Sequence, residues 1–174
     1  MTAQVSDPIL FEGRWFALAC EPLGPWLDRR KSQPLRFKRT HTACWRGYNS
    51  EWKIERGRLF LTRFSARLAN GRYAGLPTLF HNCCEQFLNE SGAYDPANQG
   101  PGRFAFWVTG IVDCHVGKLM RYKHTGYASR HEATLRLDFD AGFLIGQSII
   151  RHDIVGKGFP DDDVFADLCE AGEE

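Results

Sequence analysis

The sequence has no long hydrophobic run, since none approaches the roughly 18 apolar residues that cross a bilayer as a helix. Its first residues, MTAQVSDPILFEG, lack the cationic and apolar regions of a secretory signal peptide. We therefore expect a cytoplasmic protein without membrane association. In that compartment the six scattered cysteines are expected to be reduced and mostly to serve as small core residues.

Signatures of several catalytic and ligand-binding classes are also missing. The sequence has no Gly-x-Ser-x-Gly nucleophile elbow, no phosphate-binding loop and no dinucleotide fingerprint. It has no Cys-x-x-Cys or His-x-x-x-His pair, so we expect no zinc site at His81 to Cys84 or at Asp113 to His115, and no cofactor. These absences favour a protein that is not an enzyme.

The composition is that of a folded, aromatic-rich chain. Its 174 residues fit one domain, and 43% of them are hydrophobic. Thirteen Phe, five Trp and five Tyr favour half-buried pleated surfaces, which indicates β structure. We predict a single globular domain over residues 1–160, followed by an acidic tail over residues 161–174.

Charge is divided unevenly between these two parts. Residues 161–174 contain seven acidic side chains and no Lys or Arg, so with a whole-chain charge of +1 the remainder carries +8. A basic patch is predicted in the stretch that contains Arg29, Arg30, Lys31, Arg36, Lys38 and Arg39. Such a patch attracts phosphates or an acidic protein, although a solvated loop explains it equally simply.

The clearest structural pattern is SEWKIERGRLFLTRF, residues 50–64. Trp52 and Ile54 alternate with charged residues, Arg56-Gly57 supplies a turn, and Leu59, Leu61 and Arg63 then alternate with Phe60, Thr62 and Phe64. Alternation with period two around a glycine turn predicts a β-hairpin with one face buried.

Other segments are read in the same way. Residues 8–20 predict a hairpin with a turn at Glu12-Gly13, and Pro34 to Phe37 a short edge strand. Residues 21–31 allow one helical turn that carries Leu23, Trp26 and Leu27 inward. Residues 78–91 are the best helix candidate, with Thr78 as N-cap, before a surface loop over residues 92–102.

The last third of the chain is β in character. We predict a buried strand from Phe104 that breaks near Gly110, a turn at Gly117, and a hairpin around Ala141-Gly142 whose first strand buries Ala133, Leu135, Leu137 and Phe139. The predicted fold is therefore mainly β (α+β), an antiparallel meander forming a barrel or a two-layer sheet with one or two short helices.

The pattern Gly-Tyr-x-Ser occurs twice, at Gly47 to Ser50 and at Gly126 to Ser129. Each copy precedes a predicted hairpin. Glycine allows a bend, tyrosine buries its ring while its hydroxyl finds a partner, and serine caps a turn. We interpret the repeat as a structural device that starts a hairpin rather than as a pair of site motifs.

The densest group of polar and aromatic residues surrounds the second copy. We predict a binding surface there, extended by the corresponding residues of the first copy: Tyr122, His124, Tyr127, Ser129, Arg130, His131, Arg46 and Tyr48. A small hydrolase remains an alternative, with Ser129, Cys84 or Cys114 as nucleophile beside His124 or His131.

Five short patterns resemble those of a set of small bacterial proteins without an assigned activity. They are Arg-Gly-Tyr at Arg46 to Tyr48, Trp-x-Ile at Trp52 to Ile54, Leu-x-Leu at Leu59 to Leu61, Trp-x-x-Gly at Trp107 to Gly110, and His-x-Gly-Tyr-x-Ser at His124 to Ser129. The resemblance covers about residues 42–146 and implies successive strands. His131 stands where that set implies an aromatic residue such as Tyr, and the acidic tail is a second departure.

These observations lead us to expect a non-catalytic protein-binding module. By analogy with other small bacterial proteins, its most concrete form is an immunity protein that neutralises a cognate toxin. One alternative is a small hydrolase or ligand-binding enzyme with a site near His124 to His131. A second alternative is a protein that binds nucleic acid through residues 29–39, although the sequence contains no known nucleic-acid recognition motif. The partner and the oligomeric state are not specified by the sequence.

Overall fold

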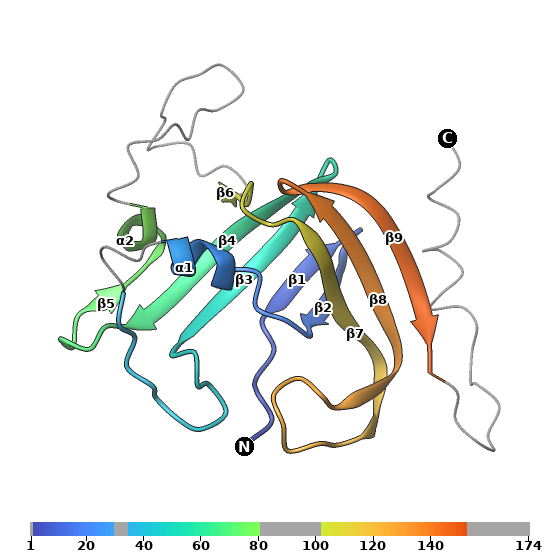
Figure 1. Ribbon diagram of the computed structural model, residues 1–174, viewed down its shortest axis with the longest axis horizontal. Helices are drawn as coiled ribbons and strands as arrows, with labels where there is room; N and C mark the ends of the chain where they lie inside the picture. The colour runs from blue at the N-terminus through green and yellow to red at the C-terminus, as the bar shows by residue number, and fades with distance from the viewer. Residues whose placement is uncertain (1, 30–34, 81–101, 153–174) are drawn as a thin grey trace.

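The computed structural model describes residues 2–29, 35–80 and 102–152 (Figure 1). Within these described residues, nine strands form one largely antiparallel sheet that closes into a ring, with two short helices beside it. The ring runs in the order β3-β1-β2-β7-β8-β9-β4 and closes through the pairing of β3 with β4, while β5 and β6 pair only with β4. The predicted mainly β fold is confirmed.

The ring begins with the hairpin of β1 (Pro8–Phe11) and β2 (Arg14–Leu18). Its turn is formed by Glu12 and Gly13, with φ angles of 49° and 74°, which is the left-handed conformation that a two-residue hairpin turn requires. β1 also pairs in parallel with β3, and β2 pairs with β7. The predicted hairpin is therefore present and joins two separate parts of the sheet.

The hairpin predicted around Arg56-Gly57 consists of β3 (Tyr48–Glu55) and β4 (Arg58–Arg67). The predicted alternation does not continue unbroken along β4, because Phe64 is buried together with Leu59 and Leu61. The pairing passes from Arg63 opposite Glu51 to Leu61 opposite Trp52, so Thr62 is an extra residue on β4. A bulge of one residue reverses the faces that follow it.

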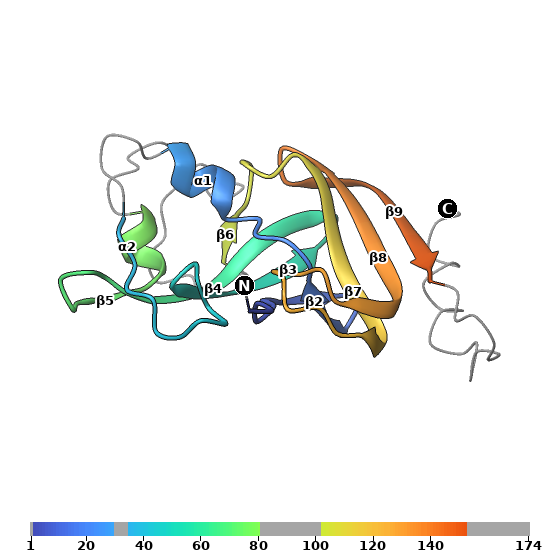
Figure 2. The ribbon, with the colours of Figure 1, turned by 60° about the horizontal axis from the view of Figure 1, so that its bottom comes forward.

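The two helices lie away from β8 and β9 in both views of the molecule, and the second of them is next to β5 (Tyr73–Ala74) (Figures 1 and 2). α1 (Gly24–Arg29) buries Trp26 as predicted. α2 (Leu76–Phe80) begins two residues before the predicted N-cap, and residues 81–91 of that predicted helix lie outside the described residues, as does most of the predicted loop that follows.

Phe37 forms a single β-bridge with Leu68. Leu35 to Phe37, the described part of the predicted edge strand, therefore contains one bridge and no strand. The described residues contain no helix that is long and apolar enough to cross a membrane.

Two details of the segment after Gly102 differ from the prediction. β6 is only Arg103–Phe104, and the chain then turns through residues 105–109, with Val108 N donating to Ala105 O at 3.0 Å, instead of continuing as a strand. β7 (Gly110–Arg121) runs straight through Gly117, where a turn was predicted. The register shifts there, so Gly117 is a bulge with φ of 76°.

The final hairpin matches the prediction. β8 (Arg130–Asp140) and β9 (Phe143–Arg151) are joined at Ala141-Gly142, and the predicted β8 residues are buried. The core fills the inside of the ring with alternate residues of the strands, including Ile9, Trp52, Leu61, Cys114, Leu135 and Phe139. The residues between them, such as Asp113 and His115 on β7, point to the outer face.

Candidate functional site

The chain between β7 and β8 forms a loop that is tied at its base. The hydroxyl group of Ser129 accepts a hydrogen bond from Lys123 N at 3.1 Å and donates to Lys123 O at 3.4 Å. Within the loop, Ala128 N donates to Thr125 O at 2.9 Å, and Gln4 N donates to Gly126 O at 2.9 Å. The loop is thus fixed both to itself and to the N-terminal segment.

The two Gly-Tyr-x-Ser units meet at one side chain, that of Arg46. Its Nη1 donates to the Tyr127 hydroxyl at 2.5 Å, and its Nε donates to Tyr48 O at 2.9 Å. The Tyr127 hydroxyl donates in turn to Glu21 Oε1 at 3.2 Å. As predicted, each unit leads into a hairpin. The hydrogen bonds of Arg46 connect the loop to the start of β3.

Arg46 also takes part in a buried polar network around Asp7. Its Nη2 lies 2.7 Å from Asp7 Oδ1, and the two side chains are 3% and 5% exposed. Ser50 donates to Asp7 through its backbone nitrogen at 2.9 Å and through its hydroxyl, and Trp52 Nε1 donates to that hydroxyl at 2.8 Å. Burial raises the pKa of Asp7, and the bonds from Ser50 and Arg46 oppose this effect.

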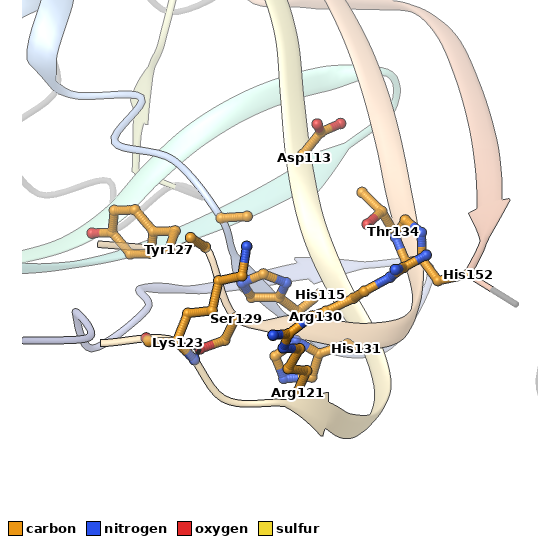
Figure 3. A pocket seen from close by; sticks show the side chains of 12 residues that line it. Asp113, His115, Arg121, Lys123, Tyr127, Ser129, Arg130, His131, Thr134 and His152 are labelled. Atoms are coloured by element: carbon orange, nitrogen blue, oxygen red, sulfur yellow. Dashed lines mark hydrogen bonds between the residues drawn. The ribbon is translucent and has the colours of Figure 1, made fainter. Parts of the chain in front are cut away.

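A pocket of about 520 Å³ opens on the outer face of the sheet, between the loop and strands β7 and β8. Tyr127 and Lys123 lie on one side of it, Thr134 and His152 on the other, and the rings of His115 and His131 between them (Figure 3). The remaining residues that line it come from β7, β8, the loop and the residue that follows β2: Ala19, Asp113, Arg121, Ala128, Ser129 and Arg130.

The centre of the pocket is a pair of stacked imidazole rings. The centroids of His115 and His131 are 4.2 Å apart, at an interplanar angle of 29°. Burial, followed by the neighbouring His131 and His152, lowers the pKa of His115 to about 4, against the opposing charge of Asp113. Burial also lowers the pKa of His131. Both rings are therefore neutral at pH 7.

Positive charge dominates the rim of the pocket. Arg121, Lys123 and Arg130 supply three cations, whereas Asp113 is the only carboxylate among the lining residues. Asp113 is already engaged by Arg136, whose Nε and Nη2 donate to its two oxygens at 2.9 Å each. The pocket thus has an excess of positive charge, which attracts anions.

Four of the predicted binding residues line this pocket, namely Tyr127, Ser129, Arg130 and His131. Arg46 and Tyr48 belong to the network that holds the loop. Tyr122 and His124 are exposed on the loop, where their rings contact each other at 4.6 Å, and they do not line the pocket.

The candidate nucleophiles are placed differently from one another. Cys114 is fully buried on the core side of β7, where burial raises the pKa of its thiol, so it does not face the pocket. Cys84 lies outside the described residues. Ser129 lines the pocket, but its hydroxyl forms hydrogen bonds with the backbone nitrogen and oxygen of Lys123.

The predicted basic patch is described in part. Arg29 ends α1, and Arg36, Lys38 and Arg39 are exposed, while Arg30 and Lys31 lie outside the described residues. Backbone bonds from Lys38 N to Arg67 O and from Ala69 N to Arg36 O hold residues 36–38 beside the end of β4. The acidic tail also lies outside the described residues.

Several pocket residues were not selected from the sequence, namely Ala19, Asp113, His115, Arg121, Thr134 and His152. Asp113 to His115 had been considered only as a metal motif. Their alternation with buried Val112, Cys114 and Val116 would have placed both polar side chains on one outer face. Among the residues that the structure describes, no group of three or more His, Cys, Asp or Glu side chains is arranged to hold a metal.

Comparison of the chain with protein-family models, with curated proteins and with solved structures found no match.

Proposed function

We propose that the protein binds a small anionic ligand in the pocket between the loop and the outer face of β7 and β8. The observation that carries this proposal is the charge of the lining, where Arg121, Lys123 and Arg130 surround neutral histidines and the one carboxylate is paired with Arg136. A concave, partly aromatic surface of about 520 Å³ has the size of a small-molecule site.

The placement of the candidate nucleophiles favours binding over hydrolysis. A serine or cysteine nucleophile needs a base within hydrogen-bond reach. Cys114 is buried in the core, on the face of β7 away from the pocket. The hydroxyl of Ser129 forms hydrogen bonds with the backbone of Lys123 at the base of the loop. We therefore assign Ser129 a structural role and the cations the main role in holding the ligand.

The proposal is tested by calorimetric titration with inorganic phosphate and with citrate at low ionic strength. We expect saturable binding, and we expect Arg130→Gln to weaken it about 10- to 100-fold, because a hydrogen bond to a charged group contributes about 1.5 to 3 kcal/mol. The matched control is Arg72→Gln, which removes one exposed positive charge that does not line the pocket and directly precedes β5, a strand far from β7 and β8 (Figure 1).

Equal weakening in Arg130→Gln and Arg72→Gln would show that the anions respond to overall charge rather than to the pocket. Absence of saturable binding to the unmodified protein would remove the proposal. Raising the salt concentration is expected to weaken binding further, because the three cations are at the solvent-exposed rim.

As a second candidate we propose the protein-binding function, most concretely immunity to a cognate toxin. It is favoured by the edge of β9, which pairs with β4 only where Phe143 meets Arg58, so that no described strand covers that edge from Ile145 onward. Ile145 is 65% exposed and Ile150 is 37% exposed. An uncovered strand edge with exposed apolar side chains can accept an extended segment of another protein.

This second function is tested by purifying the tagged protein from its source cells at moderate salt and identifying bound proteins by mass spectrometry. We expect one stoichiometric partner that is lost with Ile145→Lys, since a lysine on an edge strand blocks strand addition. Arg72→Gln should retain it. A partner bound equally well by Ile145→Lys, or no partner at all, would count against β9 as the binding edge.

A further inference from the structure

The cations of the pocket surround a small volume from different elements. Arg121 ends β7, Lys123 belongs to the loop and Arg130 begins β8. A planar carboxylate is satisfied by a single bidentate arginine, whereas a tetrahedral phosphate offers three oxygens to donors in several directions. A lining that supplies three cationic donors from three positions therefore matches a phosphate group better than a carboxylate.

The charge of the lining also suits a dianion. Three cations stand against one carboxylate that Arg136 already neutralises. A phosphate monoester carries a charge between about −1.5 and −2 at pH 7. The volume of about 520 Å³ exceeds what a phosphate group alone fills, and the rings of Tyr127, His115 and His131 provide a surface for an organic part of the ligand.

The stacked histidines make the protonation of the pocket depend on the charge nearby. His115 and His131 lie 4.2 Å apart, so a proton on either ring is opposed by protonation of the other, and both rings line the pocket with Arg121, Lys123 and Arg130. The other groups around the pair are His152, which contacts Thr134 Oγ1 at 2.8 Å, and Asp113, which is held by Arg136. Ala19, which follows β2, adds no charge to the lining.

An anion in the pocket would favour the protonated form of these histidines. A negative charge within about 4 to 6 Å raises the pKa of a histidine by about 1 to 3 units, which offsets the burial that keeps the pair neutral. The ring nitrogen Nδ1 of His131 is buried and has no hydrogen-bond partner among the described residues. Such a nitrogen can gain a proton and a partner when the ligand arrives.

We propose that the ligand is an organic phosphate monoester, held as its dianion by the three rim cations, and that its binding is accompanied by uptake of a proton by the His115–His131 pair. This inference rests on the proposed anion-binding function and adds the ligand class and the proton linkage. No covalent step is involved, because the proton comes from solvent and is returned when the ligand leaves.

The test is isothermal titration of the full chain at pH 7 with phenyl phosphate, phenyl sulfate and benzoate, each in two buffers that differ in ionisation enthalpy. Phenyl sulfate has the shape of phenyl phosphate but carries a single charge. We expect phenyl phosphate to bind at least about tenfold more tightly than the other two, with net uptake of roughly 0.5 to 1 proton.

Two variants test whether His115 and His131 take up the proton that accompanies binding. In His115→Gln/His131→Gln we expect phenyl phosphate binding to persist within about tenfold while proton uptake falls to near zero, because the rim cations remain. His124→Gln removes an exposed histidine of the same loop that does not line the pocket, and it should retain the uptake of the unmodified protein. Should the double variant not fold, the two-buffer measurement on the unmodified protein still decides.

The outcomes distinguish a failure of this inference from a failure of the proposed anion-binding function. Binding of phenyl phosphate without proton uptake overturns the role of the histidine pair, and equal binding of phenyl sulfate or benzoate overturns the phosphate assignment. In both cases the proposed anion-binding function stands. If none of the anions binds, the proposed function and this inference fail together.

Discussion

Replacing Arg46 with methionine is expected to lower the free energy of unfolding by about 3 to 5 kcal/mol, which is the usual cost of leaving one partner of a buried ion pair uncompensated. Asp7 would then be a carboxylate that is 5% exposed at its side chain and has lost its cation. The substitution also removes the hydrogen bonds from Arg46 to Tyr48 O and to the Tyr127 hydroxyl. Urea unfolding followed by tryptophan fluorescence measures the loss.

Two further variants make this prediction specific. Arg63→Met alters a β4 arginine whose side chain is 82% exposed and lies 3.8 Å from Glu51, and we expect a change within about 0.5 kcal/mol. The double variant Arg46→Met/Asp7→Leu should lose less free energy of unfolding than the two single variants lose together. In the double variant no buried charge is left without its partner. A loss below about 1 kcal/mol in Arg46→Met would contradict the assignment of Arg46 as a central buried residue.

The same substitution connects stability with the candidate site. Tyr127 lines the pocket, and its hydroxyl is held by Arg46 and Glu21. Arg46 touches none of the pocket volume itself, so it acts by positioning the loop. Arg46 and Tyr48 were predicted as binding residues, whereas the structure places neither of them in the lining of the pocket.

The hairpins could be predicted because their determinants are local. In β3–β4 and β8–β9, period-two alternation marks the buried face, and Arg56-Gly57 and Ala141-Gly142 adopt the left-handed angles of tight turns. Both signals are contained within about twenty consecutive residues, so they are readable without knowing the rest of the fold.

The bulges could not be predicted, because they depend on the partner strand. Gly117 looks like a turn residue in sequence, but β7 pairs with β8 on both sides of it, and Lys118 N is bound by Glu132 Oε2 at 2.8 Å. Thr62 likewise becomes an extra residue on β4 only because the consecutive β3 residues Glu51 and Trp52 pair with Arg63 and Leu61, on either side of it. A glycine or threonine allows a bulge, and the register of the neighbour decides it.

The pocket was partly predictable for the same reason. The loop residues Tyr127 to His131 form one local group that composition alone made visible. His115 and His152 join them only through the pairing of β7, β8 and β9, which brings Thr134 opposite His115 and Ile150 opposite Thr134. Contacts between residues far apart in sequence follow from the sheet topology, and the topology was predicted only as a class.

Replacing Trp107 with alanine is expected to cost about 3 to 5 kcal/mol of stability, the range measured for deleting large buried aromatic side chains. Trp107 lies in the turn between β6 and β7 and is 3% exposed. Its ring centroid is 4.9 Å from that of Trp26 and 5.8 Å from that of Phe80, so it joins α1 and α2 to the sheet. Its Nε1 also donates to Pro22 O at 3.0 Å.

Thermal and urea unfolding of three variants separates these contributions. Trp107→Phe keeps most of the packing and loses the bond to Pro22 O, so we expect a smaller cost of about 1 to 3 kcal/mol. Phe106→Ala is the matched neighbour, because its ring contacts Trp107 at 5.5 Å but is 39% exposed, and it should cost less than Trp107→Ala. Equal losses in the two alanine variants would mean that the turn, rather than the buried indole ring, holds the helices against the sheet.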